Sequence, residues 1–327
     1  MTTRHRPRHT GAAGVTETVT NEQLIDVLKA TIDTTGAAGL ASPQDAEAFI
    51  DLSREQTAVM QEIRIETGIR TSYNLDSSAL GEPVTVAGTE GVAPAAADVT
   101  APQRTRKVLQ PKEVVAAFDV SFSFLRKNIQ GERVNETLNT LFAKRFGKDM
   151  VMLLMGGDVA KPNDTRTNKL LRICDGVVKR AMTDASARAV VIPGSPSYAT
   201  QVFPAMIAAL PKDYRDSRED LRFFVSADVY DAYANEIGSR QTTAGDAILV
   251  GSWQTGLMFN GIRLVPVFGQ STSKIVLTPR DNLALGFGQE MTVGRDIDNR
   301  ERLLKVTITA DVDVNYAVSD ALVLGSA

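Results

Sequence analysis

A long stretch without basic residues constrains this chain more than any other feature. Residues 80–102 read LGEPVTVAGTEGVAPAAADVTAP, and no lysine or arginine occurs between Arg70 and Arg104. Strand-like segments flank the stretch, whereas a compact domain normally connects its strands in a few residues. The stretch is too apolar for an ordinary disordered linker and too poor in polar side chains for an active site. We therefore expect a projection that packs on a surface outside its own domain.

The composition is that of an ordinary globular protein, with 43% hydrophobic and 23% charged residues in a chain of 327. This length suffices for one large domain or two smaller ones. The net charge of −3 argues against nucleic-acid binding through bulk charge. The longest apolar run, residues 151–155, is too short to span a bilayer, and no apolar stretch follows the basic N-terminus as in a secretory signal. We expect a soluble protein made in a cytoplasm.

Histidine and cysteine are nearly absent from the sequence. The two histidines, His5 and His9, lie in the N-terminal tail, and Cys174 is the single cysteine. The body of the chain therefore lacks the residues for Ser-His-Asp or Cys-His catalysis, for a histidine base, and for zinc or CxxC sites. Carboxylate, lysine, tyrosine, serine and Mg²⁺ chemistry remain. We expect no enzyme activity and no catalytic, cofactor-binding or metal-binding residues.

Apolar residues at helical spacing predict several α-helices. In residues 42–60, Ser42 is a candidate N-cap and Pro43 takes the first helical position. The longest helix spans 131–158, about 35 Å at 1.5 Å per residue, and ends at two glycines. Its apolar face is expected to carry Val134, Leu138, Leu141 and Phe142. The other expected helices cover 21–33, 165–182, 196–211 and 226–238, and Cys174 is expected to be a core residue of the helix at 165–182.

Alternating apolar residues predict β-strands for much of the rest. Within residues 106–127, every second residue from Phe118 to Phe124 is apolar and shares one face. Tight turns are expected at Asn260–Gly261 and at Asp298–Asn299. The other expected strands cover 62–75, 187–194, 221–226, 256–269, 274–288, 291–298 and 303–318.

The strand at 303–318 carries polar residues along a whole side, so that side is expected to meet water or a polar partner. Its Asp311 and Asp313, with Asn315, line up as a Mg²⁺ or Ca²⁺ site requires, but a solvated strand face explains the pattern better. The glycines of MGGDVAKPNDTRTNK follow a helix and do not match a phosphate-binding P-loop. Trp253 fits either an anchor at an interface or a core residue.

Taken in order, these elements resemble the major capsid protein of tailed bacteriophages, with the Hong Kong 97-type fold and a P2-like flavour. Three segments carry the resemblance. The strand and long helix of residues 112–158 end in MGGD, residues 226–268 contain the helix and the Asn260–Gly261 hairpin, and residues 274–325 form the closing strands. Together they indicate an α+β chain that is made to assemble with copies of itself.

The resemblance implies a division of the chain into four parts, one of which is made of two segments. These are an N-terminal arm (1–62), an extended E-loop (63–112), a peripheral P domain with a spine helix (113–160 and 281–327), and an axial A domain (161–280). It also implies self-assembly into the hexamers and pentamers of an icosahedral head that encloses double-stranded DNA. The protein would be found in the virion after synthesis in the cytoplasm of the host bacterium.

The resemblance also suggests further partners and alternatives. Because only about 60 residues precede the E-loop, we expect a separate scaffolding protein. We also expect a portal protein and decoration proteins as partners, weak contact with packaged DNA, and no contact with a membrane. Some capsids of this fold join an E-loop lysine to an asparagine of a neighbour. No lysine occurs between Thr71 and Gln103, so we expect no such cross-link here. The alternatives are an encapsulin-like compartment shell and a carboxylate- or Mg²⁺-dependent enzyme that uses Asp311 and Asp313.

Within the E-loop, charged residues are the candidate inter-subunit contacts. The acidic ones face no cation of their own loop in the sequence, so we expect them to dock near basic groups of the next subunit. The set comprises Asp76, Glu82, Glu90 and Asp98, with Arg104 and Arg106 on the returning strand.

Overall fold

The computed structural model describes residues 43–55, 57–79, 103–123, 133–239 and 256–327, together with residues 85 and 87. Several sequence predictions fall outside these residues. They concern the helix at 21–33, the N-cap Ser42, Phe124, Trp253, and the loop residues Glu82, Glu90 and Asp98.

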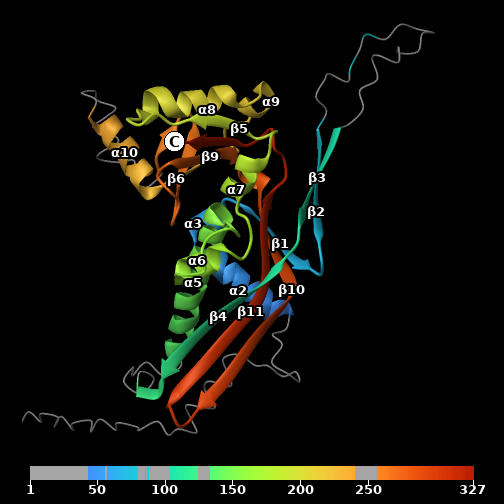
Figure 1. Cartoon of the computed structure of the whole chain (residues 1–327), viewed down its shortest axis with the longest axis vertical. Coiled ribbons are helices and arrows are strands. Elements are labelled where there is room, and N and C mark those ends of the chain that lie inside the picture. The colour runs from blue at the N-terminus through green and yellow to red at the C-terminus, as the bar shows by residue number, and fades with distance from the viewer. Residues whose placement is uncertain are drawn as a thin grey trace, which may run out of the picture.

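One part of the chain is built on a four-stranded sheet with the strand order β1-β10-β11-β4. β1 runs parallel to β10, and the other neighbours are antiparallel. Figure 1 shows β10 and β11 extending together as a long hairpin, with β4 alongside β11. The strands are β1 (Arg64–Ile69), β4 (Lys112–Ser121), β10 (Leu283–Asp298) and β11 (Leu303–Tyr316).

Helices α2 (Pro43–Glu55) and α5 (Arg133–Gly156) pack on one face of this sheet. Phe118 of β4 stacks on Phe142 of α5 with the ring centroids 3.4 Å apart. The inward face predicted for β4 is thereby confirmed. The prediction that Leu141 belongs to the buried face of α5 is wrong, because its side chain is 60% exposed. Successive residues lie about 100° apart around a helix, so Leu141 points outward when Phe142 faces the sheet.

A second sheet has six strands in the order β5-β12-β9-β6-β8-β7. Its core centres on three aromatic rings, those of Phe203, Phe223 and Tyr233. Figure 1 shows α8 and α9 lying along one side of this sheet. The elements are β5 (Arg188–Val191), β6 (Leu221–Ser226), β7 (Met258–Phe259), β8 (Ile262–Val267), β9 (Lys274–Pro279), β12 (Val323–Ser326), the π-helical turn η2 (Tyr198–Val202), α8 (Phe203–Ala209), α9 (Lys212–Arg215), α10 (Ala227–Gly238), and the 3₁₀ turn η4 (Arg280–Asn282).

The chain crosses from the first sheet into the second after β11, because β12 inserts between β5 and β9. The C-terminal strand of the predicted P domain therefore pairs within the sheet that holds most of the predicted A domain. The domain boundaries themselves stay a prediction. None of the helices among the described residues is long and apolar enough to cross a bilayer.

Several predicted elements divide in two. The helix at 165–182 is α6 (Arg166–Leu171) and α7 (Val177–Thr183), since the backbones of Gly157 and Gly176 touch between them. The amide of Gly176 donates to the carbonyl of Gly157 at 2.9 Å. Pro111 follows the end of one strand, and the break separates β3 from β4. Other divided pairs are α2 and α3 (Ala58–Gln61), β1 and β2 (Tyr73–Ala79), β3 (Gln103–Leu109) and β4, and β9 and β10, into which the strand predicted at 274–288 divides.

The structure confirms the predicted N-cap of one helix, two predicted turns and one predicted core residue. The Ser226 hydroxyl accepts a hydrogen bond from the amide of Val229 and caps α10. Asn260 and Gly261 adopt positive φ angles of 48° and 83°, as the tight turn of a hairpin requires. Asp298 Oδ1 accepts bonds from the amides at 300 and 301 in the β10–β11 turn. Cys174 is buried at 1% exposure, as expected of a core residue.

Candidate inter-subunit contact site

The predicted E-loop begins as a two-stranded ribbon of β2 and β3. The strands pair in continuous antiparallel register from Tyr73–Leu109 to Ala79–Gln103. Figure 1 shows this ribbon standing out from the body. Its root is held by apolar packing, since Leu75 and Leu109 are buried against Ile69 and Ala284. The ribbon therefore starts from a fixed base and leaves the subunit.

Asp76 and Arg106 form a cross-strand ion pair on the ribbon, with Nε and Oδ1 2.8 Å apart. The expectation that Asp76 faces no cation of its own loop is therefore wrong, because strand register places Arg106 opposite it. The hydrogen bond from Arg106 lowers the pKa of Asp76. Both side chains are more than half exposed, so the pair adds little stability. Arg104 is exposed two pairs further out, opposite Ser78.

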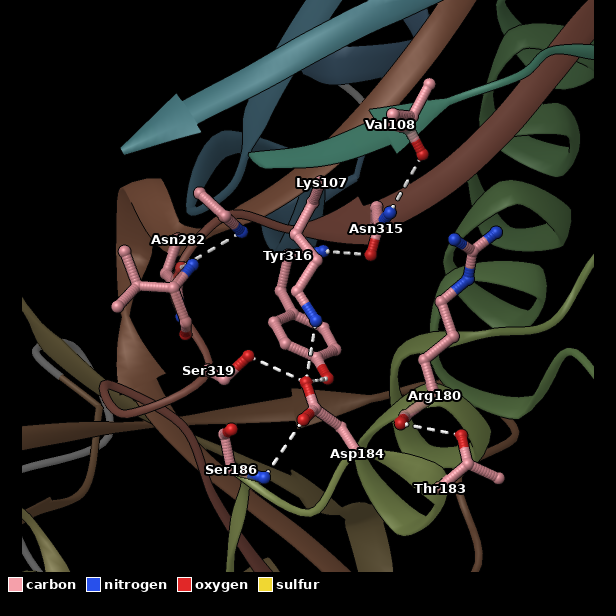
Figure 2. Close-up of polar contacts among 12 residues, drawn as sticks. Lys107, Val108, Arg180, Thr183, Asp184, Ser186, Asn282, Asn315, Tyr316 and Ser319 are labelled. Carbon is pink, nitrogen blue, oxygen red and sulfur yellow. Dashed lines mark hydrogen bonds and ion pairs between the residues drawn. The ribbon is translucent and has the colours of Figure 1, made fainter. Parts of the chain in front are cut away.

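Asp184 connects the ribbon to the body. Its Oδ2 accepts hydrogen bonds from Lys107 Nζ at 2.6 Å, from the Tyr316 hydroxyl at 2.7 Å and from the Ser319 hydroxyl at 2.6 Å. Its Oδ1 accepts a bond from the amide of Ser186 at 3.0 Å. Figure 2 shows the four donors converging on this one carboxylate.

The hydrogen bonds at Asp184 shift the pKa values of both Asp184 and Tyr316. Burial would raise the pKa of Asp184, but the bonds from Lys107, Ser319 and Tyr316 outweigh it and hold the pKa well below its usual range. Burial, together with the bond to Asp184, raises the pKa of the Tyr316 hydroxyl. Lys107 Nζ also lies 4.9 Å from the centroid of the Tyr316 ring, within range of a cation–π contact. Lys107 is thus ion-paired at the base of the loop.

Asp313 holds the connection between β3 and β4. Its Oδ2 accepts from the amide of Gln110 at 2.7 Å, and its Oδ1 accepts from Arg180 Nη2 at 2.9 Å. The neighbouring Asn315 donates its side-chain amide to the carbonyl of Val108 at 2.9 Å. The expectation of a solvated polar side along β11 is therefore wrong at its C-terminal end, where Asp313 is only 3% exposed.

The magnesium alternative gains no support from this arrangement. Both oxygens of Asp313 are occupied by donors, as described above. Within the described ranges, no three potential metal-ligating side chains come together.

A pocket of about 480 Å³ lies beside the ribbon root and is lined by Ile69, Arg70, Gln289 and Asp311. Arg70 Nε donates to Gln289 Oε1 there at 2.7 Å.

Sequence reasoning missed Asp184, Arg180 and Lys107 as residues that fix the loop. Their partners distant in sequence lie 77 to 135 residues away along the chain, and no short motif joins them. The sequence signal that was available is the polar run at the end of β11, where Asp313, Asn315 and Ser319 all contact these segments or their neighbours.

Comparison with known proteins relates this chain to one curated relative and to several solved capsid structures. No family model matches the chain. It is 24% identical over 311 residues to the putative prophage capsid protein YqbE of Bacillus subtilis, covering 92% of this chain and 97% of the relative. The capsid chain of a satellite phage P4 procapsid, solved with its size determination protein, matches with a TM-score of 0.65 at 12% identity over 93% of this chain and 96% of that one. The chain has the Hong Kong 97-type capsid fold.

Another capsid structure, that of an empty GTA particle, has a TM-score of 0.56 at 14% identity, covering 83% of this chain and 89% of that chain. In this Hong Kong 97-type chain, the β2–β3 ribbon stands where the E-loop was predicted, and α5 stands where the spine helix was predicted. The particular similarity to P2-like coat proteins stays a prediction.

Proposed function

We propose that this chain is the major capsid protein of a tailed bacteriophage or prophage. It self-assembles into the hexamers and pentamers of an icosahedral head that encloses double-stranded DNA. One observation carries the proposal: the match to a procapsid chain extends over 93% of this chain and 96% of that chain. The role is structural rather than catalytic, and the protein resides in the virion capsid after synthesis in the host cytoplasm.

The ribbon fits this function physically. An isolated two-stranded ribbon is marginally stable in water, and a long loop gains order by lying on another surface. Repetition by symmetry gives every copy such a surface on its neighbour. The encapsulin-like alternative has less support, since the curated relative that spans 92% of this chain is described as a prophage capsid protein.

The charged E-loop residues are inter-subunit contacts in this proposal. Asp76 and Arg106 neutralise each other within the ribbon, so the acidic character of the loop rests on Glu82, Glu90 and Asp98. Arg104 sits at the outer end of the described ribbon.

We infer that the basic side of α5 receives the acidic loop of a neighbouring copy. This side is defined by Leu141, Lys144, Arg145 and Lys148, which recur at helical spacing. Leu141 is 60% exposed, and Lys148 Nζ lies 5.3 Å from the ring centroid of Phe268, itself 48% exposed. An exposed surface that combines apolar groups and cations matches a loop of apolar residues and carboxylates.

Microscopy of the expressed protein tests the proposed function. Negative-stain images of purified material should show closed shells, sheets or rings of capsomers. A protein that stays monomeric at high concentration, alone and with the scaffolding protein of its own gene neighbourhood, would contradict the function.

We further propose that a separate scaffolding protein, a portal and decoration proteins act with this chain, and that packaged DNA is contacted weakly.

Charge reversal tests the E-loop contacts. The double variant Glu82→Lys/Glu90→Lys should fold like the wild type but assemble at least tenfold less, because like charges then meet at α5. Adding Lys144→Glu/Lys148→Glu should restore part of the assembly. Unchanged assembly of the first variant, or no rescue in the second, would contradict the docking on α5 and leave the capsid function standing.

A further inference from the structure

The bonds at Asp184 bring together three parts of the chain that are far apart in the sequence. Asp184 lies between α7 and β5, at the entry to the six-stranded sheet. Ser319 lies between β11 and β12, where the chain crosses from one sheet to the other. Lys107 belongs to β3 of the ribbon. Figure 2 shows these side chains meeting at one point, with the aliphatic part of Lys107 over the Tyr316 ring.

Lys107 is the outermost point at which the described ribbon is bonded to the body. It pairs with Leu75 in the ribbon register. Further out, the side-chain bonds of the described ribbon run between Asp76 and Arg106, within the ribbon itself. Closer to the root, the carbonyl of Val108 is bonded to Asn315. The direction of the described ribbon beyond Lys107 therefore depends on this last attachment.

The attachment has little freedom. A carboxylate offers about four acceptor positions, and Asp184 receives four donors, three of them on Oδ2. The side chains of Lys107 and Asp184 are 28% and 17% exposed, so water competes only partly for the ammonium group. The Nζ atom is thus held against both the Tyr316 ring and the carboxylate.

We propose that Asp184 is a positioning residue for assembly, which fixes through Lys107 the direction in which the E-loop leaves the subunit. The inference rests on the proposed function. Because Asp184 lies at the entry to the six-stranded sheet and Ser319 lies in the crossing between the two sheets, a rotation of one sheet against the other would be passed on to the ribbon. The ribbon extends about 13 Å beyond the Leu75–Lys107 pair at 3.3 Å per residue, so a rotation of about 10° displaces its described end by about 2 Å.

Hydrogen exchange on unassembled subunits tests the proposal independently of assembly. Lys107→Met removes the cation and keeps most of the aliphatic stem. The matched control is Lys305→Met, because Lys305 is 35% exposed and pairs with Asp298 and Glu301 at the distant β10–β11 turn. Lys107→Arg keeps the charge. Ser319→Ala, which removes a different donor to Asp184, serves as a second variant in case Lys107→Met does not fold.

We expect exchange in residues 73–79 and 103–109 to rise about tenfold or more in Lys107→Met, as the loss of one charge-assisted bond predicts. Exchange in α5 and in the six-stranded sheet should stay unchanged. Lys107→Arg should recover protection, and Lys305→Met should leave the ribbon as in the wild type. In assembly assays, Lys107→Met should give fewer shells, or shells of irregular size.

Unchanged ribbon exchange in Lys107→Met, or an equal rise throughout the chain, would overturn the proposal. The result is separable from the proposed function. If the wild type forms shells while Lys107→Met has normal exchange and normal shells, the capsid function stands and the positioning role falls. If the ribbon responds as expected but the wild type never assembles, Asp184 still fixes the loop, and the role in assembly falls with the proposed function.

Discussion

Arg180→Met removes the guanidinium that pairs with a buried carboxylate at the root of the E-loop. Asp313 has 4% of its side chain exposed and Arg180 has 27%, with Nη2 and Oδ1 2.9 Å apart. Removing one partner of a fully buried pair costs about 3–5 kcal/mol. Asp313 keeps bonds from the amides of Gln110 and Val314, and Arg180 is partly solvated. We therefore expect the free energy of unfolding to fall by about 2–3 kcal/mol.

Urea unfolding of unassembled subunits measures this change, with Arg145→Met as the control. Arg145 pairs with Asp149 at the same 2.9 Å, but its side chain is 62% exposed, so the control should lose less than about 1 kcal/mol. The double variant Arg180→Met/Asp313→Asn should be less destabilised than the sum of the single variants, with a coupling of about 1 kcal/mol or more. Equal losses in Arg180→Met and Arg145→Met, or an additive double variant, would refute the reasoning from burial.

Two further predictions concern acid stability and backbone packing. Hydrogen bonds hold the pKa of Asp184 below its unfolded value despite burial, so its carboxylate stabilises the fold above about pH 4 and loses this contribution as the pH falls toward the folded pKa. Asp184→Asn should therefore reduce the drop in unfolding free energy between about pH 6 and about pH 3, and an unchanged pH profile would contradict this. A Cβ on Gly157 would lie 2.7 Å from the amide nitrogen of Gly176 and 2.8 Å from the carbonyl oxygen of Leu153. Gly157→Ala should lower the unfolding free energy by about 3 kcal/mol, whereas Gly194→Ala, whose Cβ meets nothing within 4 Å, should stay within about 0.5 kcal/mol of the wild type in the same denaturation assay.

Local chemistry in the sequence predicted much of the fold. The two-residue alternation along β4 and β11 identifies strands because neighbouring side chains must point to opposite faces. The N-cap at Ser226 and the turn at Asn260–Gly261 depend on groups within three residues of each other. The long helix α5 follows from its spacing and ends near the two glycines that were expected to stop it.

Tertiary structure decided which of these surfaces are buried and which are joined. Gly157 and Gly176 touch across the gap between α5 and α7, and their contact divides a continuous helical pattern into two short helices. Leu141 has the sequence pattern of a core residue, yet it faces outward because Phe142 takes the place against β4.

The candidate site shows the same division. The stretch between Arg70 and Arg104 by itself predicted a projection, because its composition can neither form a core nor remain an ordinary linker. Its attachment could not be predicted, since Lys107 and Tyr316 are 77 and 132 residues from Asp184 and no local pattern encodes such distances. The sequence determined that a loop must leave the subunit. The direction of its base was decided only when folding brought a carboxylate from the end of α7, a hydroxyl from the crossing between the sheets and a lysine from the ribbon to one point.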